Sequence, residues 1–213
     1  LVTELEGHRG VFSLDFSNAE EELLKIGDYR KSILNEAVLG KLTSDFRQKD
    51  NRDKITKLPA DWKIVPINDL AVFIGSGVTP SGGSSNYKET GVPFLRSQNI
   101  HANELRLADV AYITREMHEQ MKRTHLMPKD VLLNITGASI GRSTFIPEDF
   151  GDGNVNQHVC IIRLNNKIIA EYLSLFLNSP VGQDSINSLQ KGVTRQGLNY
   201  DQIKSIKVNL PSI

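Results

Sequence analysis

Amide and guanidinium side chains follow an apolar run at residues 92–95. Arg96 can bridge the two hydrogen-bond acceptors of guanine, and Gln98 or Asn99 can pair with the acceptor and donor of adenine. Ser97 lies among them. The segment therefore has the chemistry needed to read base edges in DNA, although four residues alone are a weak signal.

Three further segments join polar side chains to glycines or to the start of an apolar strand. Small residues let the backbone approach a partner, and cations can meet phosphates. Each segment also has an ordinary explanation: a hairpin turn at 136–142, hydrogen-bonded loop bracing at 156–158, and a solvated connection at 191–197. If the segments at 136–142 and 191–197 read a groove, their cations and amides must converge with residues 96–99 on one face. Their polar members are Thr136, Ser139 and Arg142; Asn156, Gln157 and His158; and Lys191, Thr194, Arg195 and Gln196.

No pattern typical of a catalytic, metal or nucleotide site is found. The glycine-rich stretch at 75–83 lacks the Gly-Lys-Ser/Thr ending of a Walker loop, and Pro80 interrupts it. His118 and His125 do not have the spacing of a helical zinc site, so both are expected to be ordinary surface histidines. Signatures of amino methyltransferases and of many nucleases are also missing. We therefore expect no catalytic residue, no metal and no cofactor in this chain.

Composition limits the class of protein. The 213 residues suffice for one main domain, and 25 acidic residues balance 25 basic ones, so no overall field attracts phosphate. The single cysteine, Cys160, excludes an intramolecular disulfide and, without a signal-peptide pattern, indicates the reducing cytoplasm. No apolar run approaches the roughly 18 residues of a membrane span. The start at Leu1 rather than methionine is compatible with a fragment of a longer protein.

A long helix is expected ahead of the domain. Ser17 and Glu20 have the spacing of a capping box, which predicts a helix from Asn18 to Leu39, and Gly40 suits the left-handed position after its last turn. A heptad-like seam predicts packing against another long helix, while packing on its own domain stays an alternative. The seam consists of Leu23, Ile26, Arg30, Ile33 and Ala37.

The charged run at residues 48–57 predicts a linker. It divides the chain into a helical part at 1–57 and a domain at 58–213. In the domain, short β-rich runs mix with a few helices without regular alternation, which predicts an α+β fold. The expected strands are 62–67, 92–95, 110–113, 131–135, 143–146, 158–164 and 203–210, and the expected helices are 115–123, 167–177 and 181–190.

In their order along the chain, these pieces resemble the specificity subunits of type I restriction-modification enzymes. The target-recognition domains of that family open with Leu-Pro-x-x-Trp and then carry a Ser-Gly-x-Thr-Pro loop; residues 58–62 and 76–80 match these motifs, the second with Ser76 and Thr79. Later matches lie at 91–100, 129–134, 136–141, 156–158, 192–194 and 206–211, although Lys129 replaces the family's glycine. Residues 29–42 resemble the end of the conserved helical spacer.

The resemblance implies a division of labour. Subunits of that family carry two recognition domains held apart by two long antiparallel helices, and each domain reads half of a split double-stranded DNA target. Separate modification and restriction subunits perform methylation and cleavage. The resemblance therefore implies that this chain docks to a modification subunit. Because it has one domain and one helix, the resemblance also implies pairing with a second recognition domain or with a second copy.

Two other classes of function stay open. The chain could be a self-sufficient methyltransferase or nuclease with an atypical site, against which the missing signatures count. It could also be a protein-interaction module that does not bind DNA, for which the neutral net charge is the best argument.

Overall fold

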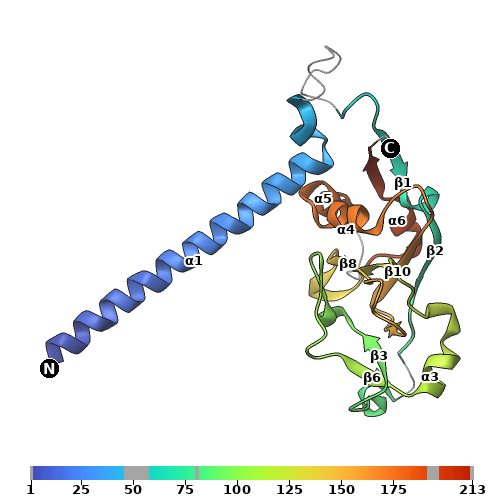
Figure 1. Ribbon diagram of the computed structural model, residues 1–213, viewed down its shortest axis with the longest axis horizontal. Coiled ribbons are helices and arrows are strands. Elements are labelled where there is room, and N and C mark those ends of the chain that lie inside the picture. The colour runs from blue at the N-terminus through green and yellow to red at the C-terminus, as the bar shows by residue number, and fades with distance from the viewer. Residues whose placement is uncertain (1, 46–57, 80–81, 191–196, 212–213) are drawn as a thin grey trace.

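The N-terminal helix α1 (Val2–Val38) extends away from the other elements of the computed structural model (Figure 1). The structure describes residues 2–45, 58–79, 82–190 and 197–211, with side chains in α1 described from residue 18 onward. The helix has 37 residues, so the predicted start at Asn18 is wrong. Because no proline precedes Ser17, nothing in the backbone ends the helix there, and the Ser-x-x-Glu pattern lies inside it.

The C-terminal end of α1 is anchored to the domain. Val38 is buried in the main core, and the Asn209 side-chain amide donates to its carbonyl oxygen at 3.0 Å. Gly40 follows with φ of 70°, which confirms the left-handed end expected there. A Cβ at this position would also lie 2.5 Å from Pro59, so only glycine fits. The predicted linker at 48–57 lies outside the described residues.

The domain contains short sheets rather than one continuous sheet. The largest has four antiparallel strands in the order β2-β10-β7-β8, and a three-stranded sheet has the order β6-β3-β9, with β3 and β9 parallel. Two further pairs are β1-β11 and β4-β5. The strands are β1 Lys63–Pro66, β2 Ala71–Ser76, β3 Val92–Leu95, β4 Ile100–His101, β5 Glu104–Leu105, β6 Ala111–Ile113, β7 Val131–Asn134, β8 Ser143–Phe145, β9 Asn154–Val155, β10 Val159–Leu164 and β11 Lys207–Leu210.

The remaining helices are short. They are α3 Arg115–Gln120, α4 Ala170–Asn178, α5 Pro180–Leu189 and α6 Tyr200–Ser205. Single 3-10 turns occupy Lys41–Thr43, Ile67–Asp69, Gly83–Asn86, Ser97–Asn99, Lys122–Thr124 and Gly137–Ser139. The α+β prediction is confirmed.

One predicted strand begins too early. The expected strand at 203–210 is helix α6 up to Ser205 and strand β11 only from Lys207. Asn199 and Gln202 form a capping box, in which each side chain bonds to the other residue's backbone N–H. This local cap starts a helix that the apolar spacing alone did not indicate.

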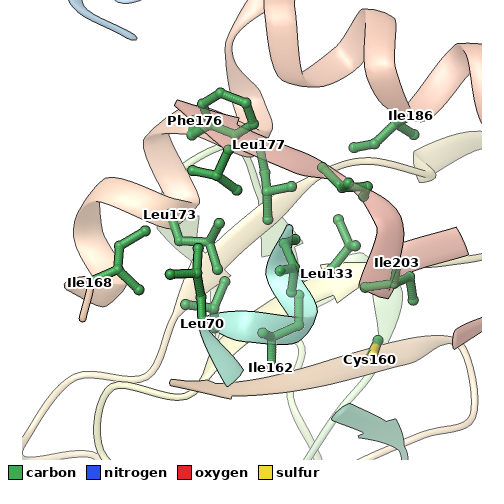
Figure 2. Packing of buried hydrophobic residues seen from close by; sticks show 14 of the residues in the cluster. Leu70, Leu133, Cys160, Ile162, Ile168, Leu173, Phe176, Leu177, Ile186 and Ile203 are labelled. Atoms are coloured by element: carbon green, nitrogen blue, oxygen red, sulfur yellow. The ribbon is translucent and has the colours of Figure 1, made fainter. Parts of the chain in front are cut away.

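Strand β10 is buried on both faces. Cys160 and Ile162 point into the main core with α4, whereas Ile161 belongs to a second cluster with Leu132 and Leu95. Figure 2 shows the first face, where Leu173, Phe176 and Leu177 pack near the strand among residues of the main core. Alternate residues of a strand face opposite sides, so a continuous apolar run is what such a position requires.

Two observations concern membranes and metals. Among the described residues, no helix is both long and apolar enough to cross a membrane. The same part of the chain contains no cluster of three or more histidine, cysteine, aspartate or glutamate side chains arranged to hold a metal ion.

Burial also determines how the protein should respond to alkaline pH. It raises the pKa of the Cys160 thiol to about 12 and that of Tyr172 to about 12, from ordinary values of 9.0 and 10.0. The folded state therefore keeps these protons while the unfolded chain loses them, so stability should fall as pH rises from about 9 to about 12. Urea unfolding across this range measures the loss, and Cys160→Ala should remove part of the slope.

Candidate nucleic-acid interface

The polar turns meet at one edge of the four-stranded sheet. Strands β2 and β7 both end where β10 begins, because Cys160 pairs with Ser76 and Val159 pairs with Asn134. The turns after β2 and β7 and the turn before β10 therefore lie side by side. Residues predicted separately in three segments are thus brought to one place.

A series of side-chain hydrogen bonds links these three turns. The Thr79 hydroxyl donates to the Gln157 side-chain oxygen, Oε1. The Gln157 side-chain nitrogen lies 3.1 Å from His158 Nε2, and His158 Nδ1 lies 2.6 Å from the Thr136 hydroxyl. An amide nitrogen only donates, so His158 Nε2 accepts and Nδ1 carries the proton. We call this series, formed by Thr79, Gln157, His158 and Thr136, the turn latch.

The turn at residues 96–99 joins the same region through backbone and side-chain bonds. The Asn134 amide nitrogen donates to the Ser97 carbonyl oxygen at 2.9 Å and to the Ser139 hydroxyl at 3.0 Å. The Asn156 backbone N–H donates to the Leu95 carbonyl oxygen at 3.0 Å. All described segments that sequence analysis singled out for DNA binding therefore converge.

Several of these side chains bond within the protein. Asn99 is 1% exposed, accepts from the Arg96 N–H and donates to the Arg106 carbonyl oxygen. The Arg96 guanidinium lies over the Tyr87 ring at 5.3 Å and donates to the Asp109 carbonyl oxygen at 2.7 Å. Buried Asn156 accepts from the His158 N–H. These contacts favour loop bracing for Asn99 and Asn156.

Other side chains face solvent. Gln98, Arg142 and Gln157 are exposed at the three turns, and Ser76, Thr79, Ser97, Thr136, Ser139 and His158 are partly exposed. Within the described residues, Arg142 has no ion-pair partner, whereas Arg106 is paired with Glu104 at 2.8 Å. The Arg106 guanidinium holds the pKa of Glu104 below its usual value, so this carboxylate stays charged. Arg142 is thus a cation available to an outside phosphate or base.

The fourth predicted segment is not described. Lys191, Thr194, Arg195 and Gln196 lie outside the described residues. The residues that follow directly, Gly197 and Leu198, lie against the end of β7: Gly197 pairs with Thr136, and the Leu198 N–H donates to the Ile135 carbonyl oxygen at 2.9 Å.

Comparison with known proteins identifies the family. The model of the type I restriction modification DNA specificity domain matches residues 59–213. The chain belongs to this family. It is 30% identical over 201 residues to the type I restriction enzyme EcoBI specificity subunit of Escherichia coli, covering 87% of this chain and 40% of that protein. It therefore spans about two fifths of the length of that relative.

Solved structures are also similar to this chain. A chain from a study of complex assembly and conformational transition of the type I R-M system matches with a TM-score of 0.53 and 16% identity, covering 92% of this chain and 45% of that chain. The HsdS subunit from Thermoanaerobacter tengcongensis matches with a TM-score of 0.49 and 15% identity, over 92% of this chain and 44% of that one.

Some residues of this specificity domain were missed by sequence analysis. The Tyr200 hydroxyl accepts from the Ser76 N–H at 2.9 Å and bonds the Ser76 hydroxyl at 2.6 Å, so it fixes the start of the first turn. Asn134 is completely buried and joins two turns. The available signal for Asn134 was its position: it is a polar residue near the end of an apolar run, three residues before Gly137. Nothing near Tyr200 in the sequence indicated its partner.

The histidines on and after α3 differ from expectation. His118 is 2% exposed, so its assignment as a surface residue is wrong. Its ring stacks on His125 at 3.7 Å, and its Nδ1 lies 2.5 Å from the Asn154 side-chain oxygen. Asn154, which is buried in β9, also donates to the Met121 and Thr124 carbonyl oxygens. These bonds hold the segment between His118 and His125 in place, and the two rings stack. These groups attach α3 to the three-stranded sheet.

The turn latch gives a direct prediction. His158→Ala removes its central member, so the turns at 76–79 and 135–141 should open more often, and their amide hydrogens should exchange faster by several-fold. Hydrogen–deuterium exchange by mass spectrometry measures this. His101→Ala is the matched control, because the one hydrogen bond of the His101 ring within the described residues is to the Gln98 carbonyl oxygen, on a turn outside the latch. Equal exchange in both variants would show that the latch does not hold these turns.

Proposed function

We propose that this chain recognises a specific double-stranded DNA sequence and performs no catalysis itself. The supporting observation is the convergence of turns far apart in sequence at one sheet edge, with Gln98, Arg142 and Gln157 exposed there. Family membership agrees with this assignment. A groove-reading surface needs such an arrangement, since amides and guanidinium groups must meet base edges together.

The charge of the chain sets the expected strength of binding. Acidic and basic residues balance at 25 each, so binding depends on the local placement of Arg142 and its neighbours rather than on a general field. Few phosphate contacts give a shallow salt dependence, because each contact releases about one counterion. A single domain should bind weakly and gain affinity when a second domain engages the other half of the target.

The proposed biological setting is a type I restriction-modification enzyme. In it, this chain supplies DNA specificity, a modification subunit methylates the target and a restriction subunit cuts DNA. The reduced, buried Cys160 fits the reducing cytoplasm. No cofactor is proposed for this chain. We also propose residues 1–57 as spacer helix and linker, and 58–213 as the recognition domain.

Helix α1 is the proposed contact with a second domain. Its seam of Leu23, Ile26, Arg30, Ile33 and Ala37 is largely uncovered in the single chain: Leu23 is 67% exposed, Ile26 47% and Ile33 57%. Apolar side chains repeated at this spacing are stabilised by a second helix. We propose that this partner is either the spacer helix of another recognition domain or α1 of a second copy.

DNA recognition is tested by selection from a pool of random duplexes, followed by fluorescence anisotropy on the selected duplex. The chain should enrich a defined sequence. Arg142→Ala and Gln98→Ala should each cost about 1 to 3 kcal/mol on that duplex if they read bases. Lys63→Ala is the control. Lys63 is exposed on β1 and lies near Leu70, the residue that precedes β2, whereas the polar turns lie at the other end of β2. Enrichment of no sequence, or equal loss in all three variants, would contradict the proposal.

Association through α1 is tested by sedimentation velocity. Ile26→Asp with Ile33→Asp places charge in the seam and should convert a dimer to the 23.7 kDa monomer without unfolding the domain. Leu24→Asp with Lys31→Asp is the control, since at about 100° per residue both lie on the opposite side of the helix. A seam variant that stays dimeric while the control dissociates would reject this contact.

A further inference from the structure

Asn134 occupies an unusual position at the end of β7. Its side chain is 0% exposed, so it cannot contact DNA. Its amide nitrogen donates to two different turns, to the Ser97 carbonyl oxygen at 2.9 Å and to the Ser139 hydroxyl at 3.0 Å. One buried group therefore fixes how these turns lie relative to each other.

The backbone of Asn134 strengthens the same junction. Its N–H donates to the Arg142 carbonyl oxygen at 2.9 Å, and its carbonyl oxygen accepts from the Gly141 N–H at 2.9 Å. The Arg142 turn is thus closed onto Asn134 by main-chain bonds, while the side chain reaches across to the turn that contains Gln98. Asn134 therefore joins the two turns directly, by its backbone to the Arg142 turn and by its side chain to the Gln98 turn.

The two turns carry exposed groups with complementary chemistry. Gln98 follows Ser97 directly, and its amide is exposed; Arg142 follows the Gly137–Ser139 turn, and its guanidinium is exposed. Neither side chain has a hydrogen-bond partner among the described residues. An amide suited to adenine and a guanidinium suited to guanine or phosphate can serve adjacent positions only if their separation is fixed.

Among the described residues, the Asn134 side chain is bonded through its amide nitrogen alone. Its side-chain oxygen is buried and has no hydrogen-bond partner in the same part of the chain. The two donated bonds are therefore what this side chain contributes to the junction of the turns.

We propose that Asn134 is a positioning residue that holds the Gln98 and Arg142 turns in register, so that the two side chains read DNA as one unit. This inference rests on the proposed DNA recognition. It assigns sequence discrimination partly to a group that never touches DNA. The turn latch formed by Thr79, Gln157, His158 and Thr136 joins the Arg142 turn to the turns at 76–79 and 156–158, and it does not include Asn134.

Asn154 provides a matched control. It is also 0% exposed, and its amide nitrogen also donates to two carbonyl oxygens, those of Met121 and Thr124. Its side chain holds α3 and His118 rather than the reading turns. Asn134→Ala and Asn154→Ala remove the same atoms and the same number of donated bonds, and Asn154→Ala also removes the bond to His118, so it should lower the melting temperature at least as much as Asn134→Ala.

The experiment compares sequence preference in the full chain. Wild type, Asn134→Ala and Asn154→Ala are each used to select from the same random duplex pool, and affinities are measured for the wild-type consensus and for a scrambled duplex at equal salt. Asn134→Ala should reduce the consensus-to-scrambled ratio by about tenfold while changing affinity for the scrambled duplex less than twofold. Asn154→Ala should keep the wild-type ratio.

Other outcomes are also decisive. An unchanged ratio in Asn134→Ala, or an equal loss in Asn154→Ala, overturns the positioning role while leaving DNA recognition intact. No preference in wild type instead overturns the proposed function. If Asn134→Ala does not fold, Asn134→Leu keeps a similar side-chain volume and removes both donated bonds. It should reduce the ratio while the scrambled-duplex affinity is kept, and an unchanged ratio in Asn134→Leu overturns the positioning role.

Discussion

The two-sided burial of β10 is the constraint on which the rest of the structure depends. Residues 159–162 are fully buried, with alternate side chains in two separate clusters. A strand enclosed in this way can shift neither in register nor in depth, since a one-residue slip would exchange its two faces. Both of its neighbours, β2 and β7, end at the edge where it begins, so the fixed strand also fixes the turns beside it.

At that edge, polar groups replace apolar packing as the source of order. Buried amides and hydroxyls hold the turns, leaving Gln98, Arg142 and Gln157 exposed. A hydrogen bond contributes only about 1 kcal/mol net, but an unpaired buried partner costs more, so such networks define one arrangement strongly. The domain can thus present different exposed residues from a constant frame, which is what a recognition module requires.

Sequence patterns predicted the elements whose signals are local. The strands expected at 92–95 and 131–135 and the helix expected at 181–190 were located within one residue, and the motifs in order indicated the family. Long-range pairings were beyond reach, because bonds such as Tyr200 to Ser76 join residues 124 positions apart. The same limit applies to Asn99 and His118, whose residue types suggested surface roles and whose burial depends on neighbours brought in by tertiary contacts.

The central claim, that one sheet edge meets DNA, is tested most directly by site-specific photo-crosslinking. Cys160 is buried, and burial raises its pKa to about 12, so a thiol-reactive crosslinker will label an introduced cysteine selectively. We expect Gln98→Cys, Arg142→Cys and Gln157→Cys to crosslink to the selected duplex. Ile169→Cys, at an exposed position beyond the other end of β10, should not. Crosslinking from Ile169→Cys equal to that from the three turns would contradict the account.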